Sequence, residues 1–247
     1  MTETAQSHQT DHGTVVSTGS PDGERPAAEG WTRDQIAERL AADLEDGFFV
    51  NLGVGIPLAV PNYLPADKEI FLHAENGVLG MGPNPGPGKE DPDLTDAGKQ
   101  PISLVSGAAI VDSATSFAII RGGHLDVTVL GALQVSQDAD LANWYVPGRN
   151  PAVGGAMDLV AGTPQVWVCM EHVDRKGRSK VVAECTMPIT GRRCVTRVYT
   201  DLAVFHVRDG RLVLVETAPG VTPERVRECT EAAYDEDLAA TPTGGDR

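Results

Sequence analysis

The stretch TRDQIAERLAADLEDGFFVNLGVGIP, residues 32–57, carries the signals for a helix, a strand and a turn in close succession. Thr32 and Gln35 have the spacing of a capping box, and apolar side chains follow at every fourth position. Gly47 is typical of the left-handed residue that ends a helix. The mostly apolar run 48–52 then predicts a buried strand. We therefore expect an amphipathic helix that leads directly into a strand.

A glycine-rich turn follows this strand. Gly53 and Gly55 form the turn, and Pro57 suits the first turn of a following helix that would reach about Tyr63. The third glycine of a dinucleotide-binding fingerprint is missing, which argues against NAD as a ligand. We instead expect Gly53 and Gly55 to lie near a substrate, whose carboxylate would meet backbone N–H groups at the start of the helix.

The rest of the chain alternates short apolar runs with helical or loop stretches. The apolar runs are residues 70–72, 102–105, 127–130, 166–170 and 202–207. Asp209-Gly210 predicts a hairpin turn, and Thr222-Pro223-Glu224 has the order of cap, proline and acid that opens a helix. The pattern predicts an α/β fold with an open, mostly parallel sheet and helices on both faces.

One folded domain, residues 31–234, is expected between two tails. Residues 1–30 are acidic and rich in Ser, Thr, Gly and Pro, without apolar periodicity, which predicts a disordered tail. His8 and His12 lie in this tail and are interpreted as solvated. Residues 235–247 are expected to form a second disordered tail.

The charge balance excludes some classes of partner. Of the 247 residues, 35 are acidic and 20 are Lys or Arg, which gives a formal net charge of −15. Nucleic acid and anionic membranes are therefore poor partners. No signal-like start and no long apolar stretch is present, so a cytoplasmic location is expected.

Histidine and cysteine spacing does not predict a metal site. The four cysteines include no Cys-x-x-Cys pair. His73, His124, His172 and His206 form no metal-ligand spacing and are interpreted as structural. His73 is expected to face away from its neighbour Glu75.

Glu75 is the main candidate for chemistry. The sequence Ala74-Glu75-Asn76-Gly77 ends a short apolar run, and Asn-Gly favours positive φ, so Glu75 should sit at a sharp corner at the end of the sheet. That edge of an open α/β sheet is where ligands bind. A glycine- and proline-rich loop, residues 80–88, follows and is expected to shape or cover the site. On residue patterns alone, a solvated turn glutamate is the competing interpretation.

Several longer motifs carry a family resemblance. They are LHAENGVLGMGP at 72–83, NLGVGIP at 51–57, GGAMDLV at 154–160, EDPDLTDAGK at 90–99, SFAIIRGGH at 116–124, LGALQVSQDADLANW at 130–144 and VAECTMPITG at 182–191. Together they resemble the β subunit of the 3-oxoacid CoA-transferase family, from about Thr32 to Thr230. The resemblance implies a CoA-transferase fold of the NagB/RpiA-like type.

The resemblance also implies the chemistry. In that family the glutamate of a Ser-Glu-Asn-Gly motif is the nucleophile, which corresponds to Glu75 and implies a covalent glutamyl-CoA thioester and ping-pong exchange. Ala74 stands where the family has serine, so a hydrogen bond from that serine is absent here. Backbone N–H groups of Gly154 and Gly155 are the implied oxyanion donors, together with a glutamine of another subunit. No cofactor is expected, because coenzyme A acts as substrate and covalent intermediate.

Other polar residues are weaker candidates for binding substrate or CoA. Asn51 and Asn143 are expected to orient Glu75 or substrate, and Lys99 to meet CoA. Asn76 and Gly77 belong to the glutamate motif and are expected to lie at the same site. For Asn51, Asn143 and Lys99, a purely structural hydrogen bond or a solvated charge is an equally good interpretation.

Within the family, the motifs look more like those of enzymes that use 3-oxoadipate, in the degradation of aromatic compounds. This resemblance implies succinyl-CoA as donor and a separate α subunit as partner. Arg149 is a candidate to meet the second carboxylate of a dicarboxylic acid. The β subunit of an acetoacetate-specific 3-oxoacid CoA-transferase, as in ketone body metabolism, remains the alternative within the family. A non-catalytic domain that binds a small anionic effector is the alternative from another class.

Overall fold

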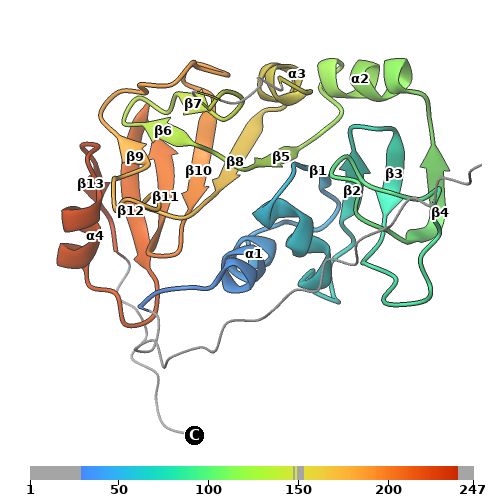
Figure 1. The fold of residues 1–247 in the computed structure, drawn as a ribbon, viewed down its shortest axis with the longest axis horizontal. Helices are drawn as coiled ribbons and strands as arrows, with labels where there is room; N and C mark the ends of the chain where they lie inside the picture. The colour runs from blue at the N-terminus through green and yellow to red at the C-terminus, as the bar shows by residue number, and fades with distance from the viewer. Residues whose placement is uncertain (1–28, 147, 149–152, 239–247) are drawn as a thin grey trace, which may run out of the picture.

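A ten-stranded sheet forms the centre of the molecule. The structure, a computed structural model, describes residues 29–146, 148 and 153–238 (Figure 1). The strands of this sheet, in spatial order, are β13 (Asp235–Glu236), β12 (Arg211–Thr217), β11 (Ala203–Arg208), β10 (Val195–Tyr199), β8 (Gln165–Cys169), β5 (Val127–Leu130), β1 (Phe49–Leu52), β2 (Phe71–Ala74), β3 (Val78–Met81) and β4 (Leu104–Ile110). The central strands β10, β8, β5, β1 and β2 are parallel, and antiparallel hairpins extend both sides. The predicted open, mostly parallel sheet is confirmed.

Helices cover both faces of the sheet, as predicted. They are α1 (Arg33–Ala42), the 3₁₀ helix η1 (Ile56–Asn62), α2 (Ser113–Arg121), α3 (Ala156–Gly162) and α4 (Pro223–Cys229). Alternate residues of β8 belong to two different apolar clusters: Val166 and Val168 pack with α2, α3 and α4, whereas Trp167 and Cys169 pack with α1 and η1. The sheet therefore separates two cores, each closed by its own helices.

The first helix begins as the sequence predicts but ends earlier. The Thr32 hydroxyl accepts from the Gln35 N–H at 3.2 Å, and the Gln35 side chain accepts from the Thr32 N–H at 2.9 Å, which completes the capping box. The helix stops at Ala42. Gly47 adopts φ +83° in the turn after it, where its N–H donates to the Glu69 carbonyl at 2.7 Å. The glycine therefore joins the turn to the chain just before β2 rather than ending the helix.

Two boundaries predicted from the sequence are wrong. Asp235 and Glu236 pair with β12 as a parallel edge strand, so the folded part extends past residue 234. Likewise β3 continues through Gly80 and Met81, which shortens the predicted loop at its beginning. The tails at 1–28 and 239–247, including His8 and His12, lie outside the described residues.

A small second sheet packs against the α2, α3 and α4 side. It contains β7 (Leu141–Ala142), β6 (Gln134–Ser136) and β9 (Val181–Val182) in that spatial order. Val135, Leu141 and Val181 of this sheet are buried in the same apolar cluster as α3. The described residues contain no helix long and apolar enough to cross a membrane.

Candidate active site

Glu75 lies at a sharp corner immediately after β2. Gly77 closes the corner with φ +114°, and its N–H donates to the Ala74 carbonyl at 2.9 Å. A Cβ at Gly77 would lie 2.0 Å from the Val111 carbonyl oxygen, so no other residue fits there without a shift of backbone. The predicted corner is confirmed, and Gly77 builds it.

The Glu75 carboxylate faces the beginning of α3. It accepts a hydrogen bond from the backbone N–H of Gly155. Burial raises the pKa of Glu75 above its usual value, Gly155 partly opposes the shift, and the nearby charge of Asp158 adds to it. A Cβ on Gly155 would lie 2.3 Å from the Glu75 Oε2 atom, so only glycine allows this approach.

A cavity of about 520 Å³ surrounds Glu75 at the carboxyl edge of the central strands. Its lining includes Gly53, Gly131 and Glu75, which directly follow β1, β5 and β2, respectively. The edge predicted for ligand binding is therefore the edge where the cavity lies. The full lining consists of Leu52, Gly53, Val54, Glu75, Ala97, Leu130, Gly131, Ala132, Leu133, Asn143, Val153, Gly154, Gly155, Ala156 and Leu159.

Asn143 is a preorganised polar group in this cavity. Thr190 donates its hydroxyl to the Asn143 Oδ1 atom at 2.7 Å, and the Asn143 Nδ2 atom donates to the Gly131 carbonyl at 3.2 Å. An amide NH₂ has two N–H groups, so one remains for a ligand. The structure thus brings Gly53, Asn143, Gly154 and Gly155 together with Glu75.

Four other predicted residues do not line this cavity. Asn76 donates to the Thr95 carbonyl at 2.7 Å, and Gly77 serves the turn, so both are structural parts of the corner. Lys99 is exposed, in a left-handed turn with φ +62° beside the cavity-lining Ala97. Asn51 is buried beneath the cavity and contacts His73. Asn76, Gly77 and Asn51 are therefore not placed to touch a ligand in this cavity.

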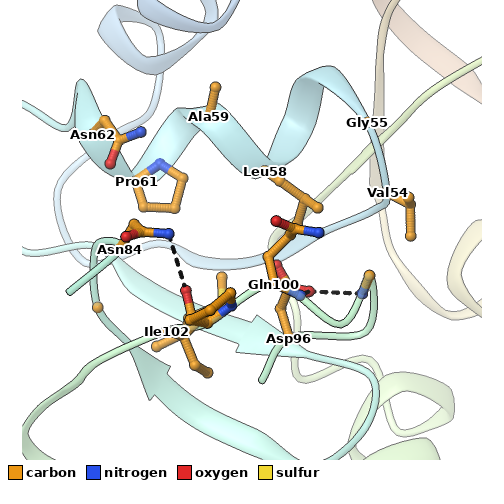
Figure 2. Close-up of a pocket in the computed structure, with 14 residues that line it drawn as sticks. Val54, Gly55, Leu58, Ala59, Pro61, Asn62, Asn84, Asp96, Gln100 and Ile102 are labelled. Atoms are coloured by element: carbon orange, nitrogen blue, oxygen red, sulfur yellow. Dashed lines mark hydrogen bonds between the residues drawn. The ribbon is translucent and has the colours of Figure 1, made fainter. Parts of the chain in front are cut away.

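A second cavity, of about 480 Å³, adjoins the first (Figure 2). Val54 lines both cavities, whereas Gly55 lines only the second. Figure 2 shows Leu58 and Ile102 on its walls, with the Gln100 side chain between η1 and the loop that contains Asp96. The lining is otherwise apolar or carries side-chain amides, which suits a neutral rather than a phosphorylated group.

The two cavities differ from an ordinary anion site in their charge. Among the described residues that line them, the ionisable side chains are the carboxylates Glu75 and Asp96, and none is cationic. Arg149, which the sequence suggested for a substrate carboxylate, lies outside the described residues. The counter-charge for an anionic substrate must therefore come from outside the described part of these walls. No group of three His, Cys, Asp or Glu side chains suited to a metal exists in the described part of the chain.

His73 is placed differently from the sequence interpretation. It shares a face of the sheet with Glu75, because residues two apart in a strand point the same way. Its Nε2 atom lies 3.0 Å from the Ser116 hydroxyl, which in turn donates to the Glu75 carbonyl at 2.9 Å. Ser116 was missed, since the only signal in the sequence is a serine within an otherwise ordinary helix.

Ala74 points to the other side of the sheet. Its side chain is buried in the apolar cluster that α1 and η1 close. A serine at this position would place its hydroxyl among apolar side chains rather than beside the Glu75 carboxylate. The corner at Glu75 is instead held from α2, by Ser116.

Known proteins resemble this chain over most of its length. The coenzyme A transferase family model matches residues 33–229. The β subunit of the 3-oxoadipate CoA-transferase of Pseudomonas putida is 56% identical over 187 residues, which cover 75% of this chain and 87% of that protein. The β subunit of the probable succinyl-CoA:3-ketoacid coenzyme A transferase of Bacillus subtilis is 49% identical over 203 residues, covering 82% of this chain and 94% of that protein.

The fold is also found among solved structures. The acyl-CoA transferase YdiF of Escherichia coli O157:H7 superposes with a TM-score of 0.66 at 21% sequence identity. The match covers 91% of this chain and 46% of that one, so this chain spans about half the length of YdiF. Family match, relatives and fold agree: the chain belongs to the coenzyme A transferase family and corresponds to the β subunit of its heteromeric members.

Proposed function

We propose that this chain provides the nucleophile Glu75 for the transfer of CoA from succinyl-CoA to 3-oxoadipate. The observation that carries this proposal is the geometry of Glu75, a half-buried carboxylate at the carboxyl edge of the sheet that accepts the Gly155 N–H and faces a cavity. The enzyme would be heteromeric, with this chain as β subunit, and would act in the degradation of aromatic compounds.

The reaction consists of two half-reactions. In the first, a Glu75 oxygen attacks the thioester carbonyl of succinyl-CoA, and the C–S bond breaks to release CoA thiolate and leave a mixed anhydride. The thiolate then attacks the Glu75 carbonyl, which forms the glutamyl-CoA thioester and releases succinate with one oxygen from Glu75. The carboxylate of 3-oxoadipate attacks this thioester in turn. The same two steps in reverse yield 3-oxoadipyl-CoA and restore Glu75 with one acceptor oxygen.

The environment of Glu75 supports this role. A carboxylate is ionised at neutral pH and needs no general base to attack a thioester. Its raised pKa makes the oxygen more basic than a solvated carboxylate, and hence a better nucleophile. The Gly155 N–H is already directed at the carboxyl group, so it can meet the oxyanion when the Glu75 carbonyl becomes tetrahedral. Such a donor is typically worth about 3–4 kcal/mol.

The surface beside the site supports a partner subunit. The edge strand β4 has the sequence LVSGAAI without a charge, and its Val105 and Ile110 are 48% and 63% exposed. The strand continues to the corner, because the Val111 N–H donates to the Gly77 carbonyl at 2.9 Å. Uncovered apolar sheet edges of this kind promote aggregation. We infer that the α subunit covers β4 and supplies the positive charge that the described cavity walls lack.

The choice of 3-oxoadipate rests on similarity. The Pseudomonas relative named for this substrate is more similar than the Bacillus relative named for a 3-ketoacid. Acetoacetate is therefore the second candidate acceptor. With the cognate α subunit, kcat/KM for 3-oxoadipate should exceed that for acetoacetate by at least about tenfold, which is about 1.4 kcal/mol of transition-state discrimination. Equal values, or a preference for acetoacetate, would reject this acceptor.

Covalent trapping tests the catalytic step. The complex is incubated with succinyl-CoA without acceptor, reduced with borohydride and digested for peptide mass spectrometry. A thioester at Glu75 would be reduced to the alcohol, so the peptide that contains this residue should change mass, and addition of acceptor before the reduction should prevent the change. An unmodified peptide after verified exposure to succinyl-CoA would show that Glu75 is not the nucleophile.

A further inference from the structure

A row of polar side chains lies in the apolar interior beneath Glu75. Thr128, Asn51 and His73 are register partners across the parallel strands β5, β1 and β2. Ser116 of α2 lies next to His73. The exposed fractions are 0% for Thr128 and Ser116, and 1% for Asn51 and His73. Buried polar groups cost stability unless they are hydrogen-bonded, so the arrangement of their bonds is informative.

The bonds connect these side chains to Glu75. Thr128 Oγ1 lies 3.4 Å from Asn51 Oδ1, and Asn51 Nδ2 lies 2.9 Å from His73 Nδ1. His73 Nε2 lies 3.0 Å from the Ser116 hydroxyl, which donates to the Glu75 carbonyl at 2.9 Å. None of Thr128, Asn51, His73 and Ser116 lines either cavity described above. They can therefore influence a ligand only through Glu75.

The direction of each bond follows from chemistry. The Asn51 Nδ2 atom also lies 3.2 Å from the His73 backbone carbonyl, which can only accept, so this atom is the amide nitrogen. His73 Nδ1 must then accept from Asn51. Burial lowers the pKa of His73 to about 4, so the ring is neutral and carries its single proton on Nε2. Nε2 donates to Ser116, whose own proton goes to the Glu75 carbonyl.

We propose that Asn51, His73 and Ser116 form a positioning relay that fixes the backbone of Glu75 so that its carboxylate meets the Gly155 N–H. The proposal rests on the function proposed above for Glu75. Glu75 lies one residue beyond the end of β2, so its carbonyl needs an anchor outside that strand, and Ser116 provides it from a helix. The relay holds the reacting carboxylate without contacting substrate, so its loss should lower kcat and leave KM unchanged.

Two histidine substitutions distinguish the relay from simple core packing. His73→Gln keeps an amide nitrogen near the Nε2 position and can still donate to Ser116, whereas His73→Asn has its amide near the Nδ1 position and cannot reach it. In the complex with its α subunit, His73→Asn and Ser116→Ala should each slow the succinyl-CoA labelling of Glu75 by about 10- to 100-fold, with His73→Gln within about threefold of the parent. The double variant Ser116→Ala/His73→Asn should be no slower than Ser116→Ala alone.

The control is Thr230→Val, which removes a hydrogen bond of 2.9 Å to another buried histidine, His172. It should lower the melting temperature as Ser116→Ala does and leave labelling unchanged. Labelling of Ser116→Ala at the parental rate, or equal rates for the two His73 variants, would overturn the relay alone. Failure to label Glu75 in the unsubstituted complex would overturn the proposed function and the relay with it.

Discussion

At the residue scale, a single contact determines what Glu75 can do. The Gly155 N–H reaches the carboxylate because neither Gly155 nor Gly154 has a side chain, but the two glycines serve different purposes. A Cβ on Gly155 would collide with Glu75, whereas a Cβ on Gly154 would meet nothing within 4 Å and only strain a backbone at φ +55°. The sequence suggested both as oxyanion donors, and the geometry favours Gly155.

Gly155→Ala should fold, because the colliding atom is the movable end of the Glu75 side chain, but it should displace the carboxylate by more than about 1 Å. We expect kcat to fall by about 10²-fold or more. Gly154→Ala should cost roughly 1–2 kcal/mol of stability and less than about tenfold in kcat. Steady-state kinetics and thermal unfolding of both variants check this, and similar kcat losses in the two would contradict the assignment.

Shortening the nucleophile is a second test at this scale. Glu75→Asp retracts the carboxylate by about one methylene, so turnover should fall at least about 10²-fold while CoA still binds. Glu75→Gln should also lose turnover, in preparations shown by mass spectrometry to be free of deamidation. Isothermal titration with CoA separates binding from catalysis. Turnover of Glu75→Asp at the parental rate would refute the mechanism.

The raised pKa of Glu75 implies a stability cost at neutral pH. Its folded pKa lies above the usual value of about 4.5, so ionisation destabilises the fold as the pH rises through this range. Glu75→Gln removes that cost and should melt at a higher temperature than the parent at pH 7. The difference should shrink towards zero as the pH falls below about 4.5, where the parent is protonated. A pH-independent difference would argue against a buried, ionised Glu75.

At the element scale, the sequence predicted what local signals encode. The capping box of α1, the strand β1 and the Thr222-Pro223 start of α4 each depend on neighbouring residues, and each is confirmed. The relay below Glu75 could not be predicted in this way. Asn51 and His73 become partners only through the parallel register of β1 and β2. Local periodicity contains no information about that register, so Asn51 was expected at the substrate itself.

The exposed strand β4 gives the prediction that belongs to this scale. Ile110→Lys places a charge on the surface assigned to the α subunit, and should weaken assembly at least about tenfold without lowering the melting temperature of the chain. Glu228→Gln on α4, at the opposite end of the sheet, changes the net charge equally and should assemble normally (Figure 1). Sedimentation velocity with the α subunit distinguishes them. Parental affinity in Ile110→Lys would place the partner elsewhere.

At the scale of the whole molecule, the site is incomplete within the described residues. The chain carries a net charge of −15, and the described cavity walls add no cation to attract an anionic substrate. It also spans about half the length of YdiF, the acyl-CoA transferase with the same fold. Both observations support the idea that a second subunit completes the active site.

The isolated chain should therefore have no CoA-transferase activity, and addition of the α subunit should restore it up to a one-to-one ratio. Because the missing groups include the charge for the substrate, raising the substrate concentration alone should not restore turnover. A titration of initial rate against added α subunit measures this. Full turnover by the purified single chain would contradict it.

The central claim, that a Glu75 oxygen bonds to each acid in turn, is tested most directly with an acceptor whose carboxylate oxygens carry a heavy isotope. After turnover with succinyl-CoA in ordinary water, mass spectrometry of the peptide that contains Glu75 should find heavy oxygen in that carboxyl group. Further turnover should then pass the label into succinate. Label that stays entirely in the acceptor and its CoA ester, with none in Glu75 or succinate, would contradict the mechanism.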